Sequence, residues 1–141
     1  MKYFSIRELS SSVTAVNHRI DNTPTKEAKE RMVELIENLL DPIREKYGKP
    51  IIVTSGYRCP LLNTFVGGSV TSQHMTGCAV DIRSTTDSLK DNKELLDCIR
   101  KMNPDYDQLI WEYGTKEGPD WIHISYNKNR NRHEFLKIGI K

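Results

Sequence analysis

Two histidines and one aspartate are of the residue types that bind metal ions in proteins. His74 and Asp81 lie within one segment, Ser72–Asp81, and His123 lies within a second, Asp120–Ser125, much further along the chain. Three ligands of mixed nitrogen and oxygen type leave one position on zinc open for water, as catalytic zinc sites do. The spacing alone is weak evidence, because a histidine and an aspartate this close together also occur by chance.

A glycine lies between the first two candidate ligands. Gly77 permits a tight bend between His74 and the following strand, so that His74 and Asp81 can face one point. That strand is expected over residues 78–82, with Ala79 and Asp81 on one face and Val80 and Ile82 on the other.

Helices are expected mainly in the first half of the chain. Ser5 and Glu8 form a capping-box pattern for a short N-terminal helix, and Thr23 is expected to cap a helix that has Pro24 in its first position. Apolar residues at steps of three and four predict an amphipathic helix over residues 26–47, kinked at Pro42 and ended by Gly48. A further helix is expected over Leu89–Met102.

Short strands follow the helices. They are expected over residues 50–54, 78–82, 107–113 and 121–126, the last two as a hairpin, whereas residues 127–141 form a basic tail with an apolar end. Early helices and later strands without regular βαβ alternation predict an α+β fold with a small antiparallel sheet flanked by helices.

Composition excludes several classes of protein. The 141 residues, 37% hydrophobic and 28% charged, are expected to form one domain over residues 1–141. A net charge of +2 is too small to indicate nucleic-acid binding. The three cysteines form no CxxC pair, which favours reduced thiols in a cytoplasm. No apolar run resembles a signal peptide or a membrane span.

Three motifs follow one another along the chain. They are Thr54-Ser55-Gly56-Tyr57-Arg58 with Asn63 after it, Ser-x-His-x-x-Gly-x-Ala-x-Asp at Ser72–Asp81, and Trp-x-His-x-Ser at Trp121–Ser125. In this order they resemble the M15 family of zinc D-Ala-D-Ala carboxypeptidases and cell-wall endopeptidases, in the compact branch also found in phage lysins. The resemblance covers most of the chain from about Tyr3. It implies a fold shared with the Hedgehog signalling domain and the zinc ligands His74, Asp81 and His123.

The general base has two candidates. The resemblance implies an acid three residues before the last histidine, here Asp120. Residues three apart on a strict strand face opposite sides, but Asp120 follows Gly118-Pro119 and can lie in a turn. Glu112 is the alternative: it could lie across a hairpin from His123 and act as the base, or hydrogen-bond a ligating imidazole. We predict Asp120 as the base, with Glu112 left open.

Other residues are expected to contact the substrate. By the resemblance Arg58 polarises the scissile carbonyl or stabilises the oxyanion, and a guanidinium suits that role because it offers a planar fork of donors. Ser72 and Tyr57 could hydrogen-bond the peptide. Trp121 could form a wall of the pocket, although a plain packing role is equally compatible with its position.

The resemblance implies zinc-dependent hydrolysis of peptide bonds in peptidoglycan stem peptides or cross-bridges. We expect a monomer without nucleic-acid or membrane partners, cytoplasmic until another protein releases it to the cell wall, as for a phage or prophage lysin. One alternative is a non-catalytic zinc-containing cell-wall binding module. Another is a binder of nucleic acid or anionic polymers that uses four basic residues of the tail, Lys128, Arg130, Arg132 and Lys137.

Overall fold

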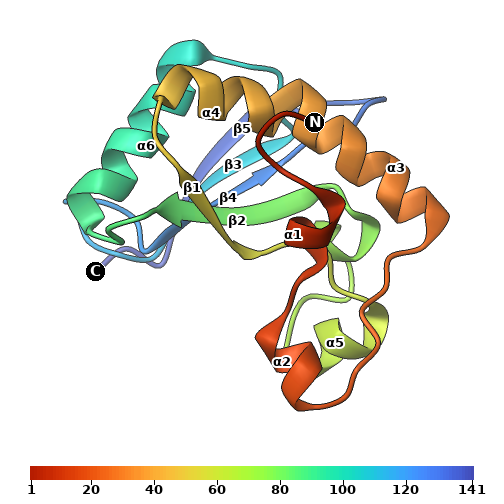
Figure 1. The fold of residues 1–141 in the computed structure, drawn as a ribbon. Helices are drawn as coiled ribbons and strands as arrows, with labels where there is room; N and C mark the ends of the chain where they lie inside the picture. Colours follow the sequence, from red (N-terminus) through yellow and green to blue (C-terminus); the bar gives the residue numbers. More distant parts are fainter.

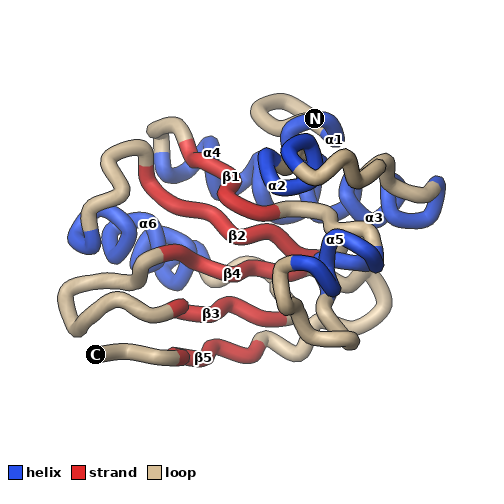
Figure 2. Tube along the Cα trace, turned by 90° about the horizontal axis from the view of Figure 1, so that it is seen from below, coloured by secondary structure: helices blue, strands red, loops and turns tan.

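One sheet carries helices on one face and an open recess on the other. The computed structural model describes residues Met1–Lys141. The helical segments are α1 (Ile6–Ser10), α2 (Val13–Asn17), α3 (Lys26–Leu35), η1 (Ile36–Leu40), α4 (Asp41–Tyr47), α5 (Pro60–Phe65), η2 (Gln73–Thr76) and α6 (Leu89–Met102). The strands are β1 (Ile51–Ser55), β2 (Ala79–Ser84), β3 (Gln108–Glu112), β4 (Trp121–Ser125) and β5 (Glu134–Ile138). Figures 1 and 2 show α3, α4 and α6 over one face, with α2 and α5 together away from them.

The α+β class is confirmed, but the expectation of a wholly antiparallel sheet is wrong. The strand order is β1-β2-β4-β3-β5, and β5 pairs with β3 in parallel while the other neighbours are antiparallel. Residues 127–141, expected as a tail, therefore supply an edge strand. His133 N–H donates to the carbonyl of Tyr106, and Glu134 N–H to that of Asp107, both at 3.0 Å. The chain thus enters β5 beside the start of β3 and must run in the same direction.

The predicted helix over residues 26–47 is confirmed in extent, with a change of helical type inside it. The segment η1 is a π-helix, and Pro42 follows it within the first turn of α4. Proline has no N–H to donate to the preceding turn, and a widened turn before it accommodates that loss within a continuous helix. Gly48 ends the helix in the left-handed conformation, with φ of 78°.

The helix starts agree in part with the predicted caps. Ser5 caps α1 as predicted, and α6 covers the predicted residues. The prediction of Thr23 as a cap is wrong: Thr23 donates its N–H and hydroxyl to Asp21 in a local turn, at 3.0 and 2.6 Å. Thr25 caps α3 instead, accepting from Ala28 N–H.

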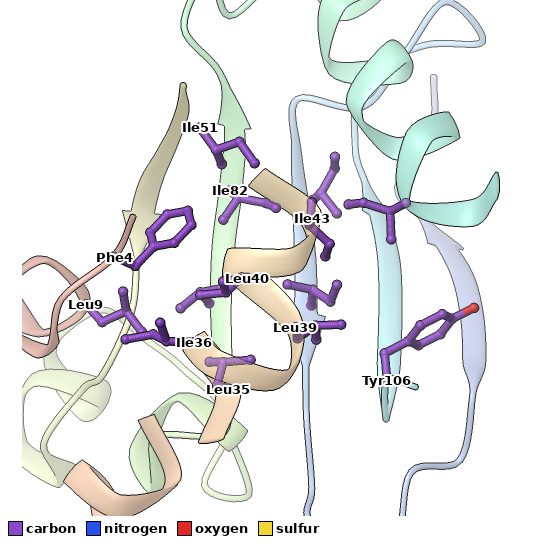
Figure 3. Close-up of a cluster of buried hydrophobic side chains, with 14 of the residues drawn as sticks. Phe4, Leu9, Leu35, Ile36, Leu39, Leu40, Ile43, Ile51, Ile82 and Tyr106 are labelled. Carbon is purple, nitrogen blue, oxygen red and sulfur yellow. The ribbon is translucent and has the colours of Figure 1, made fainter. Parts of the chain in front are cut away.

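The hydrophobic core lies between the helical layer and the sheet. Figure 3 shows side chains from the long helix meeting others from the N-terminal segment and the strands. Along β4, Ile122 and Ile124 are fully buried in this core, so that Trp121 and His123 face the opposite side. Burial of one such aliphatic side chain contributes about 1.5–3 kcal/mol to the stability of the fold. The core therefore holds the sheet in place, and with it the side chains on the opposite face. No helix of this chain combines the length and the apolar character that a membrane span needs.

Candidate metal centre

The three candidate ligands come together from three different elements. His74 is on η2, Asp81 on β2 and His123 on β4. Asp81 Oδ1 lies 3.3 Å from His74 Nε2 and 3.1 Å from His123 Nδ1. The two imidazole rings meet edge to face with their centroids 5.2 Å apart. One ligand atom of each residue lies within 4.8 Å of the others, which is the spacing that a shared cation requires.

Strand register and one glycine explain this convergence. Asp81 and His123 are direct partners across the antiparallel β2–β4 pair, so their side chains leave the sheet side by side on one face. His74 reaches the same point because Gly77 turns the chain with φ of 83°. A Cβ atom at Gly77 would lie 2.5 Å from the carbonyl oxygen of Ala28, which also excludes larger residues. The bend predicted at Gly77 is therefore present.

His74 is fixed in orientation by its neighbours. Its Nδ1 lies 2.8 Å from the carbonyl oxygen of Gly56; a carbonyl can only accept, so Nδ1 carries the proton and Nε2 is free to bind a cation. The His74 N–H donates to Ser72 Oγ at 3.2 Å, and its carbonyl accepts from Arg58 N–H at 3.0 Å. The role of Gly56 was not predicted. Its position inside the arginine motif was the available signal.

The chemistry of these donors fits zinc. The side chains of His74, Asp81 and His123 are 5%, 12% and 12% exposed, so the donor atoms lie in a sheltered recess. Burial by itself would raise the pKa of Asp81, but the adjacent imidazoles of His123 and His74 hold that pKa below the usual range. Two imidazole nitrogens and an ionised carboxylate are a donor set that zinc favours.

A cleft of about 1070 Å³ extends from these residues, with Arg58, Ser72, Glu112, Tyr113 and Trp121 among those that line it. Arg58 is half-buried there and donates to Ser55 Oγ at 3.3 Å and to Asn63 Oδ1 at 3.1 Å. Both partners are neutral, so the positive charge of the guanidinium is left uncompensated by them and faces the cleft.

Asn63 is the residue that holds Arg58. It is 3% exposed, and its Nδ2 donates to the carbonyl of Ser69 at 2.9 Å, which fixes the amide with its oxygen toward Arg58. Gly68 lies against the pair, because a Cβ atom there would be 2.1 Å from Asn63 Oδ1 and 2.7 Å from Arg58 Nη1. The loop through Gly68 thus closes over the guanidinium without room for a side chain.

The predicted substrate-contacting residues all line the cleft but differ in exposure. Ser72 is half-buried and already caps η2 through its hydroxyl. Tyr57 is 5% exposed and belongs to the hydrophobic core, where burial raises its pKa, so it offers little surface to a ligand. Trp121 is half-buried and packs against Tyr113 with ring centroids 5.2 Å apart.

The two candidate bases lie in different surroundings. Glu112 is half-buried and lines the cleft, on the same sheet face as Trp121 and His123. Burial, and then the nearby Asp81 charge, raise the pKa of Glu112. Asp120 is exposed and does not line the cleft. The structure therefore brings Glu112, and not Asp120, into the recess that holds the candidate ligands.

Tyr113 is a cleft residue that the sequence did not reveal. It has a positive φ of 57°, uncommon for an aromatic residue, and is 45% exposed. Its N–H donates to the carbonyl of Ile138 at 2.7 Å, and its carbonyl accepts from Trp111 Nε1 at 2.9 Å. Since β5 and the residues after it hold this conformation, only the tertiary structure places the ring at the rim of the cleft.

The basic residues of the C-terminal segment do not form a separate patch of free cations. Arg132 pairs with Asp107 at 2.8 Å, and Lys128 lies 3.7 Å from Glu34. The ammonium group of Lys137 lies 4.7 Å from the centroid of the Trp111 ring. Three of the four predicted polymer-binding cations thus have partners within the chain.

Comparison with known proteins identifies the family. The sequence pattern described as Peptidase M15 matches residues 2–125 of the 141-residue chain, a segment that includes all three candidate ligands, Arg58 and Glu112. No curated protein matches the chain. The match covers well over half of the sequence, and the chain therefore belongs to the peptidase M15 family.

Proposed function

We propose that this protein is a zinc-dependent peptidase that cleaves peptide bonds in the stem peptides or cross-bridges of bacterial peptidoglycan. The observation that carries the proposal is the convergence of His74, Asp81 and His123 in a cleft that also holds Glu112 and Arg58. Membership of the M15 family supports peptidase chemistry. The three converging residues would hold the zinc ion.

A bound zinc ion would supply activation of a water molecule and polarisation of the scissile carbonyl. Glu112 is the base that the geometry favours, because its carboxylate is in the cleft and its pKa is raised toward the range useful for proton transfer. It would accept the proton of the attacking water and return it to the leaving amine. This role replaces Asp120, which the resemblance implied, in our proposal.

Arg58 would act on the oxygen of the scissile carbonyl. Its guanidinium is held by Ser55 and Asn63 rather than by a carboxylate, so its charge is available to an oxyanion. Donors that are held in place before the reaction stabilise developing charge without reorganisation. Ser72 and Trp121, which also line the cleft, would contact the peptide on either side.

The size of the cleft favours an endopeptidase over a carboxypeptidase. A volume of about 1070 Å³ is slightly above the range of pockets that enclose drug-sized ligands, so the cleft has room for several peptide residues. The lining runs from Val13 of α2 to Tyr113, which follows β3, and Trp121, the first residue of β4. We therefore expect peptide residues to be bound on both sides of the scissile bond.

Digestion of purified peptidoglycan and of defined muropeptides, followed by mass spectrometry of the products, tests this proposal. New amino and carboxyl ends within a stem peptide or cross-bridge support an endopeptidase, and loss of a single terminal residue supports a carboxypeptidase. If the protein binds zinc and the cell wall but releases no product from any muropeptide, the peptidase proposal fails and the non-catalytic zinc-containing binding module replaces it.

A further inference from the structure

A buried carboxylate links the C-terminal segment to the turn that carries His74. Asp107 is 3% exposed and lies directly before β3. Its Oδ1 accepts from the N–H of Arg132 at 3.0 Å and from Arg132 Nε at 2.8 Å, and its Oδ2 accepts from Arg132 Nη2 at 3.0 Å. The same Oδ2 accepts from Gln73 Nε2 at 2.6 Å. Asp107 is therefore shared by two side chains from distant parts of the chain.

Gln73 holds the turn η2 at both ends. It directly precedes His74, and its carbonyl accepts from the N–H of Cys78 at 3.2 Å and from Thr76 Oγ1 at 3.0 Å. The side-chain bond to Asp107 thus attaches the whole His74 turn to the entrance of β3. The bond to Gly56 orients the His74 ring within the turn, whereas the bond to Asp107 places the turn itself.

The amide of Gln73 has an unusual arrangement. A carboxylate only accepts hydrogen bonds, so the amide must present its nitrogen to Asp107. Its oxygen, Oε1, is then buried without a hydrogen-bond partner, and it is the one buried side-chain polar atom of the chain in that state. Leaving a buried acceptor unsatisfied costs free energy, so this arrangement indicates a constraint other than maximal stability.

We infer that Gln73, Asp107 and Arg132 are positioning residues that set His74 for metal binding. The fork of Arg132 fixes the Asp107 carboxylate, Asp107 fixes the Gln73 amide, and Gln73 fixes the turn. Arg132 lies beyond residues 2–125, so a segment outside the family match contributes to the site. The inference rests on the metal-binding part of the proposed function and not on hydrolysis.

The direct test removes only the side-chain hydrogen bond between Gln73 and Asp107. Gln73→Met keeps the length of the side chain and leaves Asp107 and Arg132 paired. We measure the dissociation constant for Zn²⁺ by competition with a chromogenic chelator, and the thermal unfolding of the metal-free protein. Supporting hydrogen bonds around metal ligands typically change affinity about 10–100-fold, and we expect a loss of about tenfold with the unfolding midpoint little changed. Arg130→Ala, an exposed neighbour, is the matched control and should bind Zn²⁺ as the wild type does.

A double-mutant cycle tests the route from Arg132. Arg132→Ala should weaken Zn²⁺ binding in the wild-type background but add little in the Gln73→Met background, because both changes interrupt one connection. Arg132→Lys, which keeps the charge but not the fork, should restore part of the affinity. If Arg132→Ala weakens Zn²⁺ binding equally in both backgrounds, Arg132 does not act through Gln73, and that part of the inference is overturned.

The outcomes separate this inference from the proposed function. If wild-type protein binds no Zn²⁺, the proposed metal centre and the inference fail together. If wild-type and Gln73→Met proteins bind Zn²⁺ equally, only the inference fails. Should Gln73→Met lose cooperative unfolding, Gln73→Asn takes its place: it keeps the amide but is one carbon too short to reach Asp107, and wild-type affinity in it would equally overturn the inference.

Discussion

The main-chain N–H of Asp120 donates to the main-chain carbonyl of Glu112 at 3.0 Å, yet the two carboxylates lie in different environments. Glu112 is half-buried on the cleft face of β3, whereas Asp120 is exposed in the turn before β4. The carbonyl of Asp120 also accepts from Asn92 Nδ2 at 3.1 Å, which ties this turn to α6. Although Glu112 and Asp120 are adjacent in the structure, only Glu112 shares the cleft with the candidate ligands, and this distinguishes the two candidate bases.

Glu112→Gln should remove the proposed general base while leaving the candidate metal site intact. We expect kcat to fall by about 10²–10⁴-fold, the usual contribution of acid–base catalysis, with the affinity for Zn²⁺ within a few-fold of wild type. Steady-state kinetics on the muropeptide identified by digestion measure the first quantity, and chelator competition measures the second.

Asp120→Asn is the matched control, since it also replaces a carboxylate by its isosteric amide. It should retain near-wild-type kcat, because the exposed carboxylate does not line the cleft. If instead Asp120→Asn is inactive and Glu112→Gln is active, the base is Asp120, as the resemblance implied.

The sequence correctly predicted the structural features that depend on neighbouring residues. Helical periodicity predicted residues 26–47, and the tight bend at Gly77 followed from the residue type. It also selected three residues that the structure brings together, because the motif context marked His74, Asp81 and His123 out from the other histidines. These inferences needed only neighbouring residues or a known pattern.

Contacts between distant segments were beyond the same reasoning. Arg132 and Asp107 are 25 residues apart, and nothing local to either marks it as the partner of the other. The parallel direction of β5 depends on where the preceding chain attaches to β3, and a short apolar run does not encode direction. The choice between Glu112 and Asp120 likewise required the course of the turn after Tyr113, which has a positive φ.

Gly68→Ala should disturb the placement of Arg58. The added Cβ would meet Asn63 Oδ1 and Arg58 Nη1, so one of the two groups must move. Loss of one well-placed oxyanion donor costs about 10²–10³-fold in kcat, and a partial displacement should cost at least about tenfold. Zn²⁺ affinity should not change, since the atoms nearest to the added Cβ belong to Asn63 and Arg58 and not to a candidate ligand.

Gly67→Ala provides the control for that variant. Gly67 has φ of 75° and no atom within 4 Å of an added Cβ, so the change strains the backbone without touching Arg58. It should lower stability by about 1 kcal/mol and leave kcat unchanged. If Gly68→Ala and Gly67→Ala have equal kcat, displacement of Arg58 is not the cause of any loss of activity in Gly68→Ala.

Replacing one proposed ligand should remove the stabilisation expected from bound Zn²⁺. For wild-type protein at a free Zn²⁺ concentration 100 times the dissociation constant, stabilisation is about 2.7 kcal/mol and raises the unfolding midpoint. His123→Ala should show no such rise and no activity, whereas His18→Ala, which alters an exposed histidine whose ring lies tilted against that of Phe65, should behave as wild type. A His123→Ala protein that still gains stability from Zn²⁺ would contradict the proposed ligand set.

The Asp107 carboxylate should make stability depend on pH in acid. Hydrogen bonds from Arg132 lower the pKa of Asp107 from an ordinary value of 3.8 to about 2. Because the folded state binds this proton less readily than the unfolded state, the contribution is complete above about pH 5 and is lost as pH falls toward about 2.

Asp107→Asn should therefore be less stable than wild type at neutral pH by about 1.5–3 kcal/mol, with the difference shrinking as pH falls. Urea unfolding of the metal-free proteins at a series of pH values measures this difference without interference from zinc release. Asp105→Asn, which alters an exposed carboxylate two residues away, should follow the wild-type curve. A difference between Asp107→Asn and wild type that stays constant down to pH about 2 would mean that Asp107 stabilises the fold by packing rather than by its charge.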